Sequence, residues 1–562
     1  MNGNTVRGRA DAGNLDPRVQ ELRNLYGGKD AGVADLLCDR HPAQATAYTI
    51  VDEHMRQQVL TYGDLRQASE RFAAALSALG VGPGDRVATL LGKSAELLVT
   101  LLGIWRVGAV HVPLFTAFAP PAIGMRLQES AAKVVVCDRG QRSKLAPHSG
   151  FPEDPDRRIV VVGDPEKLED LAFAELLQRH EPGFAAAALG GDAPFIQIYT
   201  SGTTGRPKGV VVPILALASF HAYMEFGLDL RRDDVFWNAA DPGWAYGLYF
   251  GVIGSLALGV PSVLLTGGFS AQRTIAVLDQ LGVTNFAAAP TVYRSLRADD
   301  ASAGVGRRLR CASAAGEPLT PEINEWARHA LGVEVHDHYG QTEAGMVINN
   351  HHHPQLRRSV RAGSMGHPMP GWTMVVLRDD ADEPAPLGTV GRIAFDLPAS
   401  PLAWFSGYLR EEEKTAAKFA GGGRWYLTGD VGRVDDDGYV HFLARDDDVI
   451  IMAGYRIGPF DVESVLATHS AVAEVAVIAA PDQLRGEVVE ACVVLQEGWT
   501  ETPELAAELK QWVKTEYAAH AYPRTVHFMS ELPKTPSGKI QRAVLRERRR
   551  AELERIQPIP GT

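Results

Sequence analysis

The sequence predicts an α/β fold: a large N-terminal domain of helix-covered sheets with a small β-rich subdomain, followed by a small αβ C-terminal domain. Three observations carry this prediction. Short β-branched runs alternate with helix-like runs over most of the chain, which is typical of parallel sheets covered by helices. From about Thr389 the pattern changes to short strands and turns. After the acidic run Asp446–Asp448 a compact αβ pattern begins.

The individual elements follow from local patterns. Helices are expected at Tyr62–Leu79 and Ala95–Val107, and strands in the runs DRVATLLG, KVVVCD, RIVVVGD, VPSVLLTG and TNFAAAP. The stretch Gly247–Leu265 is uncharged and long enough to span a membrane, but four glycines and Pro261 interrupt it. We interpret it as a buried helix that runs into a buried strand.

The domain boundaries are predicted from the same changes in pattern. Residues 1–30 contain no apolar segment of the kind that a signal peptide needs, so they are expected to form a polar leader. The N-terminal domain is expected at 31–446, with its β-rich subdomain at about 389–446. The C-terminal domain is expected at 447–562.

The composition excludes several classes of protein. The 562 residues are 45% hydrophobic and 22% charged, with a formal net charge of −12, which excludes disordered and fibrous chains. No basic stripe mixed with aromatic residues is present, which argues against nucleic acid as a partner. The cysteines at 38, 137, 311 and 492 form no metal-ligand spacing, and a reducing cytoplasm is the expected location.

A glycine-rich loop follows the predicted strand Pro194–Thr200. Its sequence is Ser201-Gly202-Thr203-Thr204-Gly205-Arg206-Pro207-Lys208-Gly209. Glycines let the backbone turn its N–H groups inward, while the hydroxyls and Lys208 add donors for phosphate oxygens. The loop is not a Walker-type P-loop, because Pro207 and Gly209 flank the lysine. Taken alone, the loop fits a surface turn as well as a polyphosphate site.

The string TSGTTGRPKG resembles the phosphate-loop motif of the AMP-forming adenylate enzymes, which include acyl-CoA synthetases, peptide-synthetase adenylation domains and luciferases. Later motifs match the same family in its order: YGQTE at 339–343, YLTGD at 426–430, RDDD at 445–448, GYR at 454–456 and PKTPSGK at 533–539. The stretches GAVHVPLFTAFAP, DPGWAYGLYFG and AGYRIGPFDVES look most like medium-chain acyl-CoA synthetases, with acetyl-CoA synthetases close behind.

The resemblance implies a reaction in two steps. A carboxylic acid attacks the α-phosphorus of ATP and pyrophosphate leaves; the thiol of coenzyme A then displaces AMP from the acyl-adenylate. Two anions meet in the first step, so positive charge is needed where negative charge builds up. By resemblance, Lys539 bridges the carboxylate and the α-phosphate, Glu343 binds the Mg²⁺ that accompanies ATP, and Thr342 donates to the α-phosphate.

The nucleotide site is implied residue by residue. Asp430 is expected to accept from the ribose hydroxyls, and Tyr339 to offer a ring face to adenine opposite Gly316-Glu317-Pro318. The residues implied to bind ATP or AMP are Thr200, Ser201, Gly202, Thr203, Thr204, Gly205, Lys208, Gly316, Glu317, Pro318, Asp337, His338, Tyr339, Gly340, Gln341, Thr342, Asp430, Arg445 and Arg456.

The resemblance also implies that the C-terminal domain is mobile. Asp447 is expected to be its hinge, about which the domain rotates to withdraw Lys539 after adenylation. The rotated face is expected to bind coenzyme A. The residues implied for that face are Ala453, Gly454, Tyr455, Arg485, Tyr522 and Arg524.

The acyl group is expected among Trp244, Ala245, Tyr246, Ala315 and Gly340. Acetyl-CoA synthetases resemble this segment but carry a tryptophan where Gly340 stands, and its ring closes the pocket around two or three carbons. The missing ring predicts a medium-chain, branched or aryl acid, since each buried methylene is worth about 0.8 kcal/mol. A turn glycine that the backbone shape requires is the alternative interpretation of Gly340.

Two features depart from the family pattern or lie outside it. Ile451 stands where many relatives carry a lysine, so no polar contact of that lysine is assumed. The run His351-His352-His353 is interpreted as a solvated loop rather than a metal site.

Other functions stay open at this stage. They are an adenylating enzyme that loads a carrier protein, a short-chain (acetyl or propionyl) CoA synthetase, a luciferase-like activity, and a nucleotide-binding sensor without catalysis. The segment PKTPSGKIQR also resembles sites that protein acetyltransferases modify, so an acetyltransferase and deacetylase acting on Lys539 are expected partners.

Overall fold

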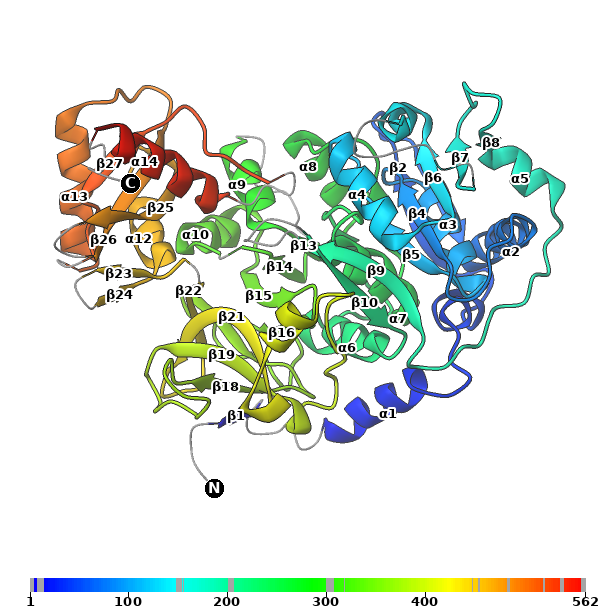
Figure 1. Cartoon of the computed structure of the whole chain (residues 1–562), viewed down its shortest axis with the longest axis horizontal. Helices are drawn as coiled ribbons and strands as arrows, with labels where there is room; N and C mark the ends of the chain where they lie inside the picture. The colour runs from blue at the N-terminus through cyan, green and yellow to red at the C-terminus, as the bar shows by residue number, and fades with distance from the viewer. Residues whose placement is uncertain are drawn as a thin grey trace.

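A computed structural model of the chain describes residues 5–7, 15–147, 154, 156–200, 207–299, 308–317, 319–446, 448–452, 455–482, 486–518, 521–535 and 540–556. Three sheets and their covering helices make up the described residues (Figure 1), which confirms the predicted α/β class.

The largest sheet combines a parallel and an antiparallel part. Its strands follow the order β1-β18-β19-β21-β22-β17-β16-β15-β14-β13-β11-β12-β2-β3, with β20 beside β21. The run from β2 to β15 is parallel, and the run from β15 to β1 is antiparallel. The bounds are β1 Thr5–Arg7, β2 Thr46–Val51, β3 Gln57–Thr61, β11 Phe236–Asn238, β12 Ser262–Leu265, β13 Asn285–Ala288, β14 Cys311–Ala315, β15 Val335–Gln341, β16 Gly345–Asn349, β17 Ser364–Pro368, β18 Thr373–Leu377, β19 Gly391–Asp396, β20 Phe419–Ala420, β21 Trp425–Val434 and β22 Val440–Arg445.

The second sheet is parallel except at one edge, where β10 pairs antiparallel with β9. Its order is β10-β9-β5-β4-β6-β7-β8. The bounds are β4 Arg86–Leu90, β5 Val110–Pro113, β6 Val134–Asp138, β7 Arg158–Val162, β8 Leu171–Ala172, β9 Pro194–Thr200 and β10 Lys208–Pro213. Strands β4, β6 and β7 confirm three of the predicted β-branched runs. Strand β9 leads directly into the glycine-rich loop.

The third sheet belongs to the C-terminal part of the chain, which lies to one side of the molecule in Figure 1. Its order is β24-β23-β26-β25, with β27 parallel to β26. The bounds are β23 Ile450–Met452, β24 Tyr455–Ile457, β25 Val472–Asp482, β26 Gly486–Leu495 and β27 Thr525–Phe528, with helices α12 Pro459–Leu466, α13 Pro503–Glu516 and α14 Arg542–Ile556.

Helices cover the two larger sheets. Their bounds are α1 Asp16–Tyr26, α2 Tyr62–Ala78, α3 Ala95–Arg106, α4 Pro120–Ser130, α5 Phe173–Arg179, α6 Ala216–Ala222, α7 Ser255–Leu258, α8 Ala271–Gln280, α9 Pro290–Ala298, α10 Pro321–Ala330 and α11 Glu412–Ala416; π-helical segments are η2 Asp35–Asp39, η4 Tyr223–Gly227 and η5 Gly247–Gly254, and 3₁₀ segments are η3 Arg139–Leu145, η7 Leu397–Ala399 and η8 Gly421–Gly423.

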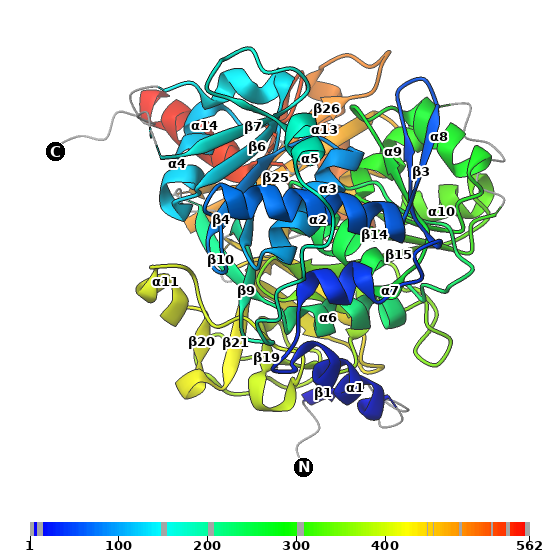
Figure 2. The same ribbon diagram turned by 90° about the vertical axis from the view of Figure 1, so that its right-hand side faces the viewer.

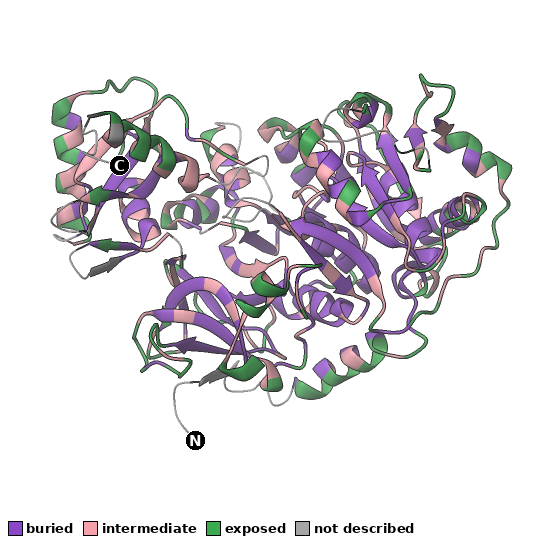
Figure 3. Ribbon diagram, viewed as in Figure 1, coloured by how far each residue is buried: buried purple, intermediate pink, exposed green. Residues whose placement is uncertain are grey.

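The predicted helices begin at recognisable caps. Thr61 and Asp64 form a reciprocal capping box at the start of α2, and Ser94 caps α3. Figure 2 shows these two helices lying across the second sheet, and Figure 3 shows buried strands beneath more exposed helices. The stretch 247–265 forms η5, α7 and β12, so the prediction of a buried helix followed by a strand is confirmed. No helix among the described residues has the length and apolar character that a membrane crossing requires.

Two sequence-based expectations differ from the structure. Part of the expected polar leader is helix α1, which buries Val19, Leu22 and Tyr26 and packs against α6, because these apolar side chains recur on one helical face. The antiparallel region also begins before Thr389, since β17 and β18 already pair into it.

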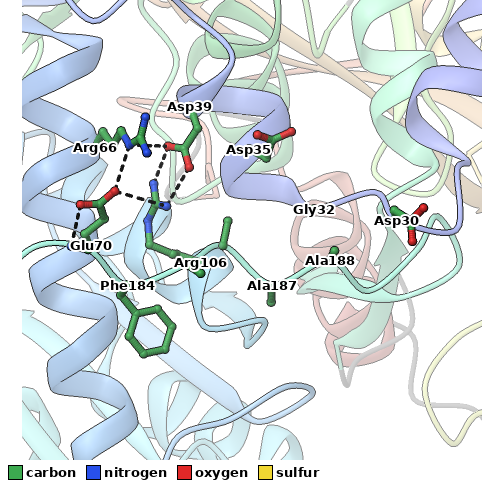
Figure 4. Close-up of a pocket in the computed structure, with 13 residues that line it drawn as sticks. Asp30, Gly32, Asp35, Asp39, Arg66, Glu70, Arg106, Phe184, Ala187 and Ala188 are labelled. Carbon is green, nitrogen blue, oxygen red and sulfur yellow. Dashed lines mark hydrogen bonds and ion pairs between the residues drawn. The ribbon is translucent and has the colours of Figure 1, made fainter.

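A cavity of about 440 Å³ lies between α2, η2 and the segment at 183–188, away from the sequence motifs (Figure 4). Inside it, Arg106 is 1% exposed and donates to both carboxylate oxygens of Asp39, at 2.8 and 2.6 Å, with Glu70 at 4.0 Å. A paired buried guanidinium of this kind stabilises the fold as long as both partners are present.

We expect Arg106→Met to lower the free energy of unfolding by about 3–5 kcal/mol, because Asp39 loses its two short hydrogen bonds to a fully buried guanidinium and keeps only Arg66, at 3.9 Å. Arg66→Met is the matched control: its side chain is 53% exposed and touches the same Asp39 and Glu70. That variant should cost about 1 kcal/mol or less. Urea unfolding of both variants checks the prediction, and equal losses would contradict it.

Candidate active site

The predicted site residues converge where β15 ends beside β21 and β22. Strand β15 carries Tyr339 and Gln341, β21 carries Asp430, and β22 ends at Arg445. The register pairs Asp430 with Arg445, so a carboxylate and a guanidinium face each other at the ends of neighbouring strands.

Asp430 is 3% exposed and is the centre of a hydrogen-bond network. Its carboxylate accepts from the Tyr339 hydroxyl, from Gln341 Nε2 at 2.8 Å and from Arg445 Nη1 at 3.1 Å. Of the described residues, only Arg445 donates to Oδ1, and a carboxylate oxygen accepts two hydrogen bonds. This oxygen therefore retains an acceptor position for a ligand hydroxyl.

Glu343 lies in the same region and is 8% exposed. The Tyr408 hydroxyl donates to its Oε1 at 2.7 Å, and Lys208 Nζ lies 4.4 Å from the centre of the Tyr408 ring. The structure thus brings Lys208, from the end of the glycine-rich loop, close to Glu343, from the YGQTE motif. A carboxylate oxygen is a ligand that Mg²⁺ prefers, and a nearby lysine suits the polyphosphate that binds with the ion.

The sequence prediction missed two residues of this cluster. Lys418 donates from Nζ to the carbonyl oxygens of Thr428, at 2.8 Å, and Leu427, at 3.2 Å, and burial lowers its pKa. Tyr408 orients Glu343. A single lysine in AAKFA and a tyrosine in SGYL carry no local signal, so only the fold reveals them.

The expected adenine side is partly described. Tyr339 is half-buried, with its hydroxyl bonded to Asp430, and Gly316 adopts φ +103° before Glu317, which pairs with Arg294 at 2.9 Å. Asp337 lies two residues before Tyr339 on β15. Burial raises the pKa of its carboxyl to about 8. This carboxyl is therefore protonated over most of the neutral range.

The raised pKa of Asp337 predicts a pH-dependent stability. The folded state holds its proton between about pH 4 and 8 while the unfolded state releases it, so stability falls as pH rises through this range, by up to about 1.4 kcal/mol per pH unit. Asp337→Asn should flatten this part of the curve of unfolding free energy against pH. Exposed Asp233→Asn should leave the curve unchanged, and an unchanged curve in Asp337→Asn would contradict the assignment.

Two of the expected acyl-pocket residues, Trp244 and Tyr246, contact other aromatic side chains. The Trp244 ring packs against Phe115 and Phe118 at centroid distances of 5.1 and 5.4 Å. The Tyr246 hydroxyl contacts the Tyr223 hydroxyl at 3.2 Å. Ala315 is 2% exposed on β14, and Ala245 packs against the main core.

The structure favours the second interpretation of Gly340, a glycine that the backbone shape requires. A Cβ on Gly340 would lie 2.2 Å from the Gly345 carbonyl oxygen and 2.4 Å from Met346 Sδ. Strand β16 approaches the bulge at this position so closely that only glycine fits. The contacts therefore support the backbone-shape interpretation of Gly340, and Met346 Sδ lies beside the position that a Cβ would take.

The solvated-loop interpretation of the histidine run is also wrong. His351 and His352 are 3% and 6% exposed, and the His352 ring stacks on His336 at 3.7 Å with planes 8° apart. His336, His338 and His352 present nitrogens within 4.8 Å of one another. Imidazole lone pairs lie in the ring plane, so two rings stacked in parallel planes cannot both point at one ion. Both His338 nitrogens also bond to protein, and the geometry therefore favours a packed cluster over a metal site.

Several predicted residues lie outside the described part of the chain. They are Ser201, Gly202, Thr203, Thr204, Gly205, Pro318, Asp447, Ala453, Gly454, Arg485 and Lys539, and only the backbone of Tyr455 and Arg456 is described. The Asp446 N–H donates to the Gly429 carbonyl at 3.0 Å. The Asp448 N–H donates to the Arg445 carbonyl of β22, also at 3.0 Å, while the Asp448 carboxylate pairs with Arg546 of α14.

On the expected coenzyme A side, two cations flank one ring. The Arg524 guanidinium lies 3.9 Å and Lys514 Nζ 4.0 Å from the centre of the Tyr522 ring. Ile451 is 54% exposed on β23, and its backbone N–H donates to Glu487 at 2.8 Å.

Comparison with known proteins identifies the class. A family model described as AMP-binding enzyme matches residues 37–409, and one described as AMP-binding enzyme C-terminal domain matches residues 461–539. Acetyl-coenzyme A synthetase of Bacillus subtilis is 35% identical over 87% of this chain and 85% of its own length. Human mitochondrial acyl-coenzyme A synthetase ACSM4 is 36% identical over 87% and 84%. A crystal structure of Brucella canis acyl-CoA synthetase matches with a TM-score of 0.73 and 44% identity, covering 96% of this chain and 98% of that one.

The chain therefore belongs to the AMP-binding enzyme family. Its reaction is the AMP-forming ligation of a carboxylic acid to coenzyme A, with ATP and Mg²⁺.

Proposed function

We propose that this ligase activates a medium-chain, branched or aryl carboxylic acid. The observation that carries the proposal is the residue at position 340, a glycine where acetyl-CoA synthetases carry the tryptophan that closes their pocket. Met346 fills the space instead, and a flexible thioether side chain yields to a longer acyl group more readily than an indole ring does.

The wall of the proposed pocket supports a larger apolar acid. Trp244, Phe115 and Phe118 form a contiguous aromatic cluster, against which methylenes or a ring would pack. The relatives do not separate the chain lengths, because an acetyl-CoA and an acyl-CoA synthetase match about equally well.

In the proposed first step, the substrate carboxylate attacks the α-phosphorus and pyrophosphate leaves. Lys539 bridges the two anions, Thr342 donates to the α-phosphate, and Lys208 meets the outer phosphates. Asp430 holds the ribose through the acceptor position left on Oδ1, with Arg445 beside it. Glu343 and the phosphates bind Mg²⁺, which neutralises phosphate charge.

In the proposed second step, the C-terminal domain turns about Asp447. The Asp446 N–H bond to β21 and the ion pair of the Asp448 carboxylate with α14 support this position, and rotation would break the bond of the Asp448 N–H to the Arg445 carbonyl. Tyr522 and Arg524 then contact the coenzyme A nucleotide, where a stacked guanidinium suits a phosphate.

We place the protein in the cytoplasm and propose that acetylation of Lys539 blocks adenylation by removing its charge. Four free, buried cysteines support a reducing location. The acetylation proposal predicts that acid-dependent pyrophosphate release is lost after chemical or enzymatic acetylation of Lys539 and is restored by deacetylation.

The test of the substrate class is AMP formation with ATP, Mg²⁺ and acids from acetate to decanoate plus benzoate, each with and without coenzyme A. We expect kcat/KM for hexanoate or benzoate to exceed that for acetate about a hundredfold, since about four methylenes are buried. A preference for acetate would overturn the chain-length proposal. Turnover indifferent to coenzyme A would favour loading of a carrier protein.

A further inference from the structure

A buried hydrogen-bond chain connects strand β15 to the proposed acyl pocket. His338 Nε2 lies 3.1 Å from the Asn350 carbonyl oxygen, and His338 Nδ1 lies 2.8 Å from the Tyr223 hydroxyl. The Tyr223 hydroxyl in turn lies 3.2 Å from the Tyr246 hydroxyl. Tyr223 is 0% and His338 2% exposed, whereas Tyr246 is partly exposed at the pocket end of the chain.

The direction of every hydrogen bond in this chain is fixed from its buried end. A carbonyl oxygen only accepts, so His338 Nε2 carries the proton and donates to Asn350. Burial holds the pKa of His338 well below its ordinary value, so the ring is neutral and Nδ1 is an acceptor. Tyr223 must therefore donate to Nδ1, which leaves its oxygen to accept the proton of Tyr246.

The pocket end of the chain is consequently an acceptor. Because the Tyr246 proton is committed to Tyr223, the Tyr246 oxygen presents lone pairs and no donor. If Tyr246 instead directed its proton into the pocket, the hydroxyl oxygen of Tyr223, a fully buried side chain, would lose its hydrogen-bond donor, which is unfavourable. The proposed pocket wall of Trp244, Phe115 and Phe118 is otherwise ring carbon; its one polar atom, Trp244 Nε1, is buried and has no hydrogen-bond partner among the described residues.

We infer that Tyr246 selects carboxylic acids whose acyl group carries a hydrogen-bond donor, a hydroxyl or an N–H, at the position that reaches its oxygen. Tyr223 and His338 are positioning residues that set the polarity of Tyr246. The inference rests on the proposed function, because it takes the assignment of Tyr246 to the acyl pocket as its starting point.

The experiment compares matched acids that differ only in donor capacity. Benzoate and hexanoate are each assayed unsubstituted, with a hydroxyl, and with a methoxy group at each position in turn, as coenzyme A-dependent AMP formation. At one position the hydroxyl acid should exceed the methoxy acid about tenfold in kcat/KM, because methoxy offers only an acceptor to an acceptor.

Two variants test the hydrogen-bond chain from His338 through Tyr223 to Tyr246. Tyr246→Phe should bring the ratio of hydroxyl to methoxy turnover close to one. Tyr223→Phe releases the Tyr246 proton toward the pocket, so the ratio should invert in favour of the methoxy acid, an effect that a merely structural role would not produce. The matched control is Tyr26→Phe, which removes an equally buried tyrosine–histidine hydrogen bond, to His221 at 2.8 Å, between residues that are not assigned to the pocket. Its ratio should equal that of the unmodified enzyme.

The outcomes separate the two proposals. Robust turnover of unsubstituted acids with a ratio near one at every position overturns the donor inference and leaves the proposed function standing. An unchanged ratio in Tyr246→Phe overturns it as well. Absence of coenzyme A-dependent AMP formation with every acid overturns the proposed function and the inference with it.

Discussion

Lys539→Ala is expected to lower acid-dependent ATP–pyrophosphate exchange by at least about a thousandfold, because no other cation of the motif would bridge the carboxylate and the α-phosphate. Thioester formation from a supplied acyl-adenylate should remain largely intact, since in the proposed second step the C-terminal domain has turned and withdrawn Lys539. Measuring both half-reactions separately checks the prediction. An equal fall in both would show that Lys539 has a different role.

The structure provides a matched control for this variant. Lys534 and Ile540 pair across the base of the motif, and Lys534 Nζ bonds to Glu474 at 2.6 Å. Lys534→Ala removes a lysine from the same motif but breaks only a partly exposed ion pair, worth about 1 kcal/mol or less. Exchange should stay within about twofold of the unmodified enzyme in this control. A loss as large as that in Lys539→Ala would mean that the fold of the loop, not the charge of Lys539, is responsible.

Asp430→Asn is expected to raise the KM for ATP about 10- to 100-fold. The substitution keeps the size of the side chain but replaces the charged carboxylate that accepts from Arg445 and Gln341. We assign the same carboxylate to the ribose hydroxyls, and hydrogen bonds to charged groups contribute about 1.5–3 kcal/mol. The KM for the acid should change much less. Steady-state kinetics with each substrate varied in turn measures both.

Asp435→Asn is the control for Asp430→Asn. Asp435 follows β21 and also pairs with an arginine, Arg361, at 2.9 Å, and with His441 at 3.1 Å, outside the predicted motifs. It should lower stability slightly without raising the KM for ATP. A similar KM increase in both variants would show that the effect of Asp430 is general destabilisation of the β21–β22 pair.

The sequence predicts the fold class because its signals are local. The β-branched runs became β4, β6, β7 and β12, and the capping residues Thr61 and Ser94 start the helices at the expected positions. The same kind of signal was present for α1, where Val19, Leu22 and Tyr26 share one helical face, but the surrounding polar residues concealed it.

The site was predictable only as far as its motifs extend. Asp430, Arg445 and Glu343 stand in recognisable strings, and the fold brings them together. Lys418 and Tyr408 reach the same site from segments without a motif. Whether a residue is buried depends on contacts distant in sequence, so His351 and His352 look like a polar loop, and the crowding of Gly340 by β16 is invisible before β15 and β16 pair.

The central claim is that this site activates its acid as an acyl-adenylate. Its most direct test supplies a preferred acid with both carboxylate oxygens replaced by ¹⁸O, together with ATP, Mg²⁺ and coenzyme A, and locates the label by mass spectrometry. Attack on the α-phosphorus followed by cleavage of the acyl C–O bond predicts one ¹⁸O in each AMP and one in each acyl-CoA. Unlabelled AMP, or label in orthophosphate alongside ADP, would contradict the account.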